Sequence, residues 1–118
     1  MKNKNELFIV HKKVNGKNRY IVTLIKDLNV KAQFEVNNYK KVLYIAKASS
    51  PLNISSLKFG VNPYDISILQ ENYSGEKWYV VTVDLYKDEE FTTILCKICP
   101  TYKYAIKFIS DIFPYLYF

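Results

Sequence analysis

The chain has few of the residues that enzymes and metalloproteins place at their sites. Its 118 residues include two Cys, one His and three Gly. Three glycines exclude a glycine-rich phosphate-binding loop. The chain has a single histidine, His11, and no combination of nucleophile, base and acid can be recognised in the sequence. We therefore expect a protein that is not an enzyme and that carries no cofactor and no metal.

The two cysteines form a lone C-x-x-C, Cys96-Lys97-Ile98-Cys99. A zinc site would need a second cysteine pair or nearby histidines, and a redox motif would need a helix N-terminus. We expect both residues in a strand, with Cys99 buried as a small apolar side chain. The sequence leaves open whether the pair has a redox role.

Long apolar runs are also missing, because none approaches the roughly 18 residues of a membrane span. The first six residues lead into only four apolar ones, Leu7–Val10, so no signal peptide and no membrane partner are expected. The protein is predicted to be cytoplasmic. A composition of 49% hydrophobic and 24% charged residues is typical of one folded domain at this length.

The most informative pattern that is present is an internal repeat. Glu6–Leu24 aligns with Asp65–Val83 at a fixed shift of 59 residues, and four residues of insertion later Tyr39-Lys40 aligns with Tyr102-Lys103. The identical pairs in the first stretch include Ile9/Ile68, Gly16/Gly75, Tyr20/Tyr79, Val22/Val81 and Thr23/Thr82. We interpret this as a duplication of residues 1–49 in residues 64–118, joined by a connector at 50–63. Because each unit alone would be marginally stable, we expect the two to share one compact domain.

Each unit is predicted to hold three strands and one helix. In the first, strands at Leu7–Val14, Arg19–Lys26 and Lys31–Val36 are followed by cap candidates Asn37-Asn38 and by a helix with Tyr39, Val42, Leu43 and Ala46 on one face. In the second, strands at Ile66–Glu71, Lys77–Tyr86 and Phe91–Cys99 precede a helix capped by Thr101. Turns are expected at Asn15-Gly16 and Ser74-Gly75.

Two boundaries complete this prediction. The second helix should end near Phe113, since Pro114 disfavours helical geometry in the residue before it. Residues Ser49–Pro63 show little periodicity and are expected to be irregular. The fold class is α+β: two tandem βββα units related by a pseudo-twofold duplication, with antiparallel sheet and helices packed on it.

The βββα pattern resembles the N-terminal DNA-binding domains of phage tyrosine recombinases and their plant ethylene-response-factor relatives. The residues that carry the resemblance are Gly75, Trp78 and Cys99-x-Thr101-x-x-Tyr104-Ala105 in the second unit, and Gly16, Arg19 and Val36-x-Asn38-x-x-Lys41-Val42 in the first. Members of that family read DNA with the exposed face of the sheet. The resemblance therefore implies DNA contacts by Lys12, Lys17, Arg19 and Thr23.

Charge separates the two halves. Residues 1–63 hold twelve Lys or Arg against three Asp or Glu, a net charge of +9, whereas residues 64–118 hold five against eight, a net charge of −3. The basic half is expected to attract phosphate, with Lys12, Lys13, Lys17, Arg19 and Thr23 as the nucleic-acid-binding residues. The alternative is a lysine-rich solvated surface from an AT-biased coding sequence, which also accounts for sixteen Lys to one Arg. With one arginine, little base-specific readout is expected.

Aromatic residues make up 16% of the chain. Tyr44, Tyr104, Tyr115, Tyr117 and Phe118 are the ones hardest to bury in so small a protein, and exposed aromatics mark protein interfaces. The alternative is that the C-terminal aromatics fold back and complete the core.

Two functions fit these patterns. The first is a small binding protein whose basic repeat is directed at nucleic acid or a nucleoprotein. The second is an inhibitor or adaptor of the kind that phages and other mobile elements carry, which binds a host defence protein, or a second copy of itself, through the exposed aromatics. The sequence does not decide between them.

Overall fold

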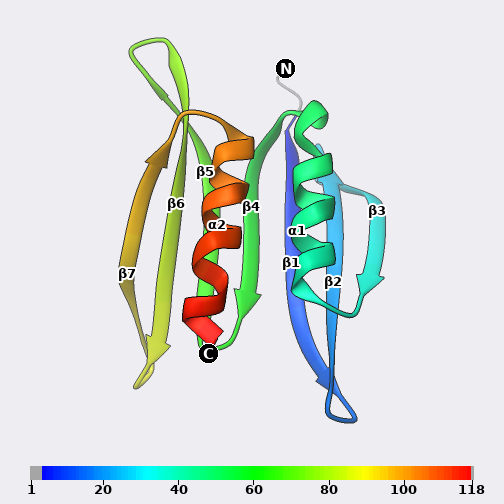
Figure 1. Cartoon of the computed structure of the whole chain (residues 1–118). Coiled ribbons are helices and arrows are strands. Elements are labelled where there is room, and N and C mark those ends of the chain that lie inside the picture. Colours follow the sequence, from blue (N-terminus) through cyan, green and yellow to red (C-terminus); the bar gives the residue numbers. More distant parts are fainter. Residues whose placement is uncertain (1–3, 118) are drawn as a thin grey trace.

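One seven-stranded sheet forms the framework of the protein (Figure 1). The computed structural model describes residues 4–117. Its elements are β1 (Asn5–Val14), β2 (Lys17–Lys26), β3 (Asn29–Val36), α1 (Tyr39–Ala48), a 3-10 turn (Ser50–Leu52), β4 (Ile54–Val61), β5 (Tyr64–Tyr73), β6 (Glu76–Lys87), β7 (Glu90–Cys99) and α2 (Tyr102–Tyr117). The strand order is β3-β2-β1-β4-β5-β6-β7, and β1 pairs with β4 in parallel while the other neighbours are antiparallel. The α+β class is confirmed.

Five two-residue turns join the antiparallel strands: Asn62-Pro63 joins β4 to β5, and the other four have positive φ at both residues. The turns at Asn15-Gly16 and Ser74-Gly75 lie where the sequence predicts them, and both residues of each have positive φ, as type I′ turns require. Asp27-Leu28 joins β2 to β3 and Asp88-Glu89 joins β6 to β7 with the same geometry. These turns match the twist of the strands and allow each hairpin to close without a longer loop.

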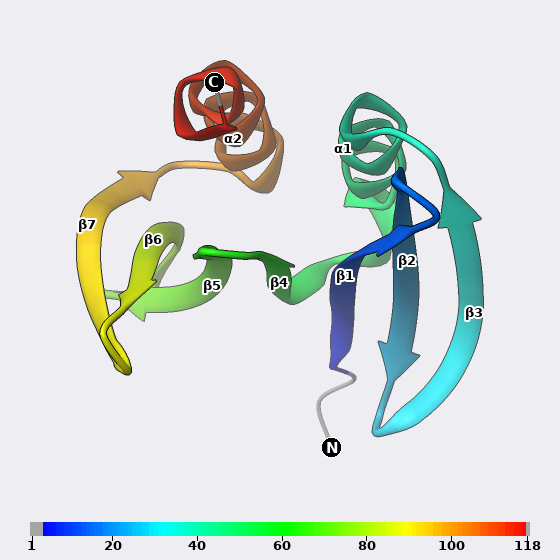
Figure 2. The ribbon, with the colours of Figure 1, turned by 90° about the horizontal axis from the view of Figure 1, so that it is seen from below.

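Both helices lie on the same face of the sheet and leave the opposite face uncovered (Figure 2). The apolar face predicted on the first helix is buried, apart from the partly buried Tyr39, and Tyr102, Ala105, Ile106 and Ile109 of α2 are buried as well. They pack on alternate residues of the strands, among them Leu7, Val22, Phe59 and Val81. Since these residues come from both halves of the chain, the two halves share one core.

The prediction that Ser49–Pro63 is irregular is wrong, because this segment contains a central strand. Strand β4 joins the two halves of the sheet, with Leu57, Phe59 and Val61 alternating toward the helices and fully or almost fully buried. Opposite Asn5 and Glu6 the register shifts, because β4 has one extra residue there. The buried residues Ile54 and Leu57 are therefore three positions apart instead of two or four. That irregularity interrupts the alternation of apolar residues, so the segment had no clear strand pattern.

The predicted end of the second helix at Phe113 is also wrong. Helix α2 continues through Pro114 to Tyr117. Phe113 is buried, its ring is stacked 4.3 Å from that of Tyr39, and Leu116 packs against the core. Burial of these apolar groups outweighs the bias that proline imposes on the residue before it.

The observed element order is not a simple repeat of βββα. Residues 5–48 run β1-β2-β3-α1, but the second half begins with the additional strand β4 before β5-β6-β7-α2. The β1–β2 and β5–β6 hairpins extend beyond the helices at opposite ends of the sheet, and the two helices run in opposite directions (Figure 1). The two halves therefore differ by one strand, and that strand is the one that joins them.

Candidate functional site

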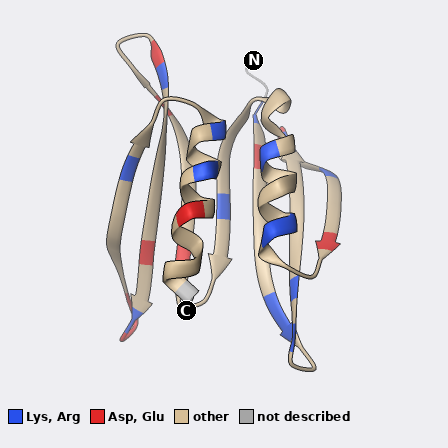
Figure 3. Ribbon diagram, viewed as in Figure 1, with Lys and Arg blue, Asp and Glu red and all other residues tan. Residues whose placement is uncertain are grey.

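The hairpin of β1 and β2 carries the cations that the sequence singled out. Residues 10–23 contain three Lys and one Arg and no Asp or Glu. Because Leu7 and Ile9 face the helices, Lys12 faces the uncovered side of the sheet, where it lies opposite Arg19 in the register. All four cations are exposed, at the end of the sheet where the hairpin passes beyond α1 (Figure 3).

Alternation divides the five predicted binding residues between the two faces. Lys12, Lys17, Arg19 and Thr23 lie on the uncovered face, whereas Lys13 lies on the face that bears the helices. The structure therefore brings four of the five residues together on one surface.

Polar side chains of β3 hold two residues of this surface in place. The Arg19 Nε atom lies 3.7 Å from Glu35 Oε1, and both side chains are substantially exposed, so the ion pair is weak. The Thr23 hydroxyl accepts a hydrogen bond of 3.1 Å from Gln33 Nε2. These contacts orient Arg19 and Thr23, whereas Lys12 and Lys17 have no side-chain hydrogen-bond or ion-pair partner among residues 4–117.

Beyond the hairpin the uncovered face is mixed in character. It exposes apolar side chains on strands of both halves, including Val10, Leu69 and Ile98. It also carries Asp65 and Asp84, which lie directly opposite each other on β5 and β6. The face is therefore cationic at the β1–β2 hairpin and anionic on the far half of the sheet.

The predicted interface aromatics do not form one patch. Tyr44 on α1 is 74% exposed and Tyr115 on α2 is 86% exposed. Tyr104 is 47% exposed and lines a small hollow with Lys107, Phe108 and Asp111. The side chain of Tyr117 and the whole of Phe118 lie outside the described part of the chain.

A groove between α1 and α2 was missed by sequence reasoning. Residues of both helices line a hollow of about 510 Å³, and a second hollow of about 360 Å³ continues it past Tyr44. The edges of this groove carry Lys40 and Lys47 from α1 and Lys103 and Lys107 from α2. The sequence could have indicated the α1 side of the groove, because Lys40, Tyr44 and Lys47 are spaced i, i+4 and i+7 and so share one helix face. The lysines of α2 meet them only through the tertiary packing.

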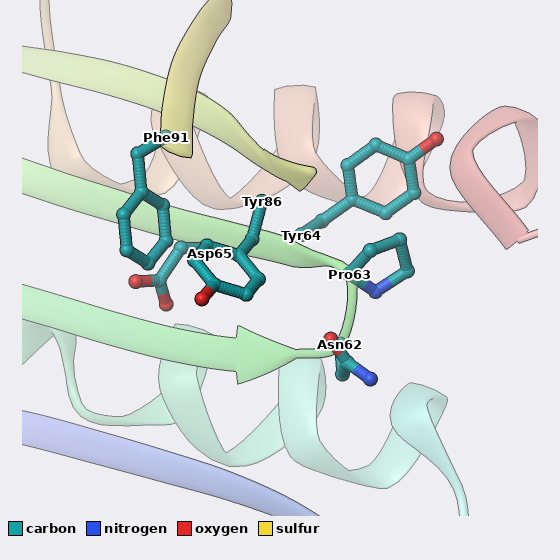
Figure 4. A pocket seen from close by; sticks show the side chains of 6 residues that line it. All are labelled: Asn62, Pro63, Tyr64, Asp65, Tyr86 and Phe91. Carbon is teal, nitrogen blue, oxygen red and sulfur yellow. The ribbon is translucent and has the colours of Figure 1, made fainter. Parts of the chain in front are cut away.

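A third hollow, of about 390 Å³, lies at the turn between β4 and β5 (Figure 4). The rings of Tyr86 and Phe91 are 4.8 Å apart and lie beside the Asp65 carboxylate, while the ring of Tyr64 lies near Pro63. The hollow offers one carboxylate and two partly exposed rings at the rim of the sheet.

The two cysteines are separated by the sheet. An odd spacing of three residues along β7 places Cys96 on the uncovered face and Cys99 in the core. Burial raises the pKa of the Cys99 thiol, and nearby Lys97 offsets only part of this effect. Within residues 4–117 no group of three His, Cys, Asp or Glu side chains has the arrangement of a metal site.

No helix in the described part of the chain has the length and apolar character needed to cross a membrane. Comparison with protein-family models, with curated proteins and with solved structures finds no match to this chain.

Proposed function

We propose that the protein is a small non-enzymatic nucleic-acid-binding protein of the cytoplasm and that the β1–β2 hairpin contacts the phosphate backbone. The observation that carries this proposal is the placement of Lys12, Lys17 and Arg19 on one exposed surface, with Lys13 behind them and no acid within residues 10–23. Lysines that neutralise phosphates release condensed counterions, which supplies most of the affinity in non-specific binding. The binding is expected to depend strongly on salt and little on base sequence, because Arg19 is the one arginine available for guanine.

We also propose that residues 5–48 and 64–117 arose by duplication, with β4 as a strand added between the copies. Support comes from the shift of 59 residues, from turns at equivalent positions and from equivalent helix caps. Asn38 Oδ1 accepts from the Lys41 amide at 2.9 Å, and Thr101 Oγ1 accepts from the Tyr104 amide at 3.1 Å. Under the resemblance to recombinase DNA-binding domains, the uncovered sheet face is the DNA-reading face, and the acidic copy is a structural or partner-facing one.

A charge-reversal series tests the hairpin. Replacing Lys12, Lys13 and Lys17 by Glu should abolish binding to generic duplex DNA and RNA and leave the fold intact, since all three side chains are exposed. The matched control replaces three exposed lysines of the second half, Lys77, Lys87 and Lys97, by Glu. This control makes the same change in net charge and should retain most of the affinity. Equal loss in both variants would show that only the net charge matters, and unchanged affinity in the hairpin variant would reject the site.

An inhibitor or adaptor that binds a host defence protein is the second candidate. The observation that favours it is the exposure of Tyr44 and Tyr115 on the helical layer, since tyrosines are frequent energetic anchors of interfaces. If Tyr115 is such an anchor, Tyr115→Ala should weaken complex formation by more than about 1 kcal/mol without changing the thermal unfolding temperature. Point substitution is preferable to deletion of the tail, because Leu116 packs against the core.

A further inference from the structure

The groove between α1 and α2 is a second cationic surface, on the opposite face of the sheet from most of the hairpin site. Its two hollows share Tyr44 and Lys47, so they adjoin each other, and together they make a channel along α1. The floor is apolar and includes Leu43 and Ile106, both of which are buried in the core. A channel of this kind has a rigid base, because its floor belongs to the packed interior.

Charge along the channel is of one sign. Lys40, Lys47, Lys103 and Lys107 line it, and no Asp or Glu is among the residues that line either hollow. Helix α1 contains no acid at all. One groove lysine, Lys107, has an acidic partner: Asp111 lies 3.7 Å from it as an exposed i,i+4 pair and lines the separate hollow at Tyr104. Such a pair contributes little, so the channel presents a site for a polyanion.

Tyr44 stands at the junction of the two hollows with 74% of its surface exposed. An exposed ring between lysines is the arrangement with which proteins hold single strands, since bases stack on the ring while the cations follow the phosphates. A duplex stacks its bases on one another and offers no free face to Tyr44. An acidic peptide would satisfy the lysines but would leave the face of the ring unused.

We propose that the α1–α2 groove binds single-stranded nucleic acid, with one base stacked on Tyr44 and the adjoining phosphates held by Lys40, Lys47, Lys103 and Lys107. The ten residues of α1 give the channel a length of roughly 15 Å. At about 3.4 Å per stacked nucleotide, this length accommodates about four nucleotides. The site is independent of the β1–β2 hairpin, because it uses the helical face.

The test measures the affinity of the full chain for a fluorescent oligothymidylate by anisotropy, alongside a duplex of equal length. Tyr44→Ala should weaken single-strand binding by about tenfold, the typical effect of removing one stacked base, and leave duplex binding unchanged. Tyr44→Phe keeps the ring and should bind like the wild type. Tyr104→Ala removes an exposed tyrosine outside the groove and serves as the matched control. Replacing Lys40 and Lys107 by Gln should reduce the slope of log affinity against log salt by about 0.7 for each phosphate that the variant no longer neutralises.

Several outcomes would overturn this proposal. They are an unchanged affinity in Tyr44→Ala, an equal loss in Tyr104→Ala, or a poly-glutamate peptide that competes for the groove as strongly as the oligonucleotide. The hairpin variant with Lys12, Lys13 and Lys17 replaced by Glu separates the two sites. If that variant binds duplex normally while Tyr44→Ala still loses the single strand, the hairpin proposal fails and the groove stands. If the hairpin variant loses duplex and Tyr44→Ala loses nothing, the reverse holds.

Discussion

Replacement of Phe59 by Ala is expected to destabilise both halves of the protein together. Phe59 lies on β4, the strand that joins the halves, and its side chain is fully buried. Its ring meets that of Tyr20 on β2 edge-on at 6.0 Å and that of Phe113 on α2 at 5.6 Å. Phe113 in turn stacks on Tyr39 of α1, so one aromatic cluster connects the first hairpin with both helices.

The size of the effect follows from the apolar surface that the substitution removes and from the cavity that it leaves. Truncation of a buried phenylalanine to alanine costs about 3–5 kcal/mol, because transfer free energy and aromatic pairing are lost and the cavity closes only in part. Domains of this size have a free energy of unfolding of about 5–15 kcal/mol. The variant should therefore lose about a fifth or more of its stability. Phe59→Leu keeps most of the apolar volume and should lose about 1.5 kcal/mol or less.

Urea unfolding measures this prediction with two probes. Fluorescence of Trp78 reports on the second half, and far-UV circular dichroism reports on the whole sheet and both helices. Both probes should shift to the same lower midpoint with an unchanged slope, as a single cooperative unit requires. The matched control is Phe91→Ala, which removes the same ring at an exposed position where it touches Tyr86 and should cost about 1 kcal/mol or less. A loss below about 1 kcal/mol in Phe59→Ala, or separate midpoints for the two probes, would refute the reasoning.

Two further predictions concern buried titratable groups. The Tyr102 hydroxyl is a buried polar atom without a hydrogen-bond partner in the described structure, and burial, followed by proximity to Tyr79, raises its pKa above the ordinary value of 10.0. Tyr102→Phe should therefore raise the free energy of unfolding at neutral pH by about 1 kcal/mol, as judged by the urea midpoint. Because the unfolded state releases this proton first, the wild type should also lose stability as the pH rises above 10, and the variant should lose less; a less stable variant would contradict this account. For the cysteines, a thiol-reactive disulfide reagent should modify exposed Cys96 in the native protein but buried Cys99, whose pKa is raised, only on unfolding, and two equally fast reactions would contradict the assigned faces.

The features that the sequence predicted well depend on a few neighbouring residues. The Asn15-Gly16 and Ser74-Gly75 turns need positive φ at two adjacent positions, which short polar residues and glycine adopt at low cost. The caps at Asn38 and Thr101 each need one side-chain oxygen and an amide three residues later. Such local requirements can be recognised in the sequence without knowledge of the fold.

Strand β4 shows why the arrangement of the sheet could not be predicted in the same way. Its partner on one side is β1, which is parallel to it and about fifty residues earlier in the chain. Because parallel strands are not joined by a tight turn, no turn residues in the sequence indicate this pairing. The register shift near Asn5 also breaks the alternation between Ile54 and Leu57. The repeat also gave no reason to expect a strand here, because a connector between two copies of a unit is not required to contain one.

The distribution of charge along the chain was an incomplete guide to the charged surfaces of the fold. The sequence assigned the positive charge to the first half, yet the α1–α2 groove draws Lys103 and Lys107 from the half with net negative charge. The acidic residues of that half lie mainly on its strands and turns, and α2 contains one acidic residue, Asp111. Most of the hairpin cations and the groove lie on opposite faces of the sheet, and Lys13 is the hairpin cation on the helical side. A single nucleic acid that engages both surfaces must therefore pass around an edge or an end of the sheet and be single-stranded in the groove, or else two separate molecules bind at once. A junction between duplex and single strand supplies both kinds of segment in one molecule, and linking them raises the effective concentration of the second segment after the first has bound.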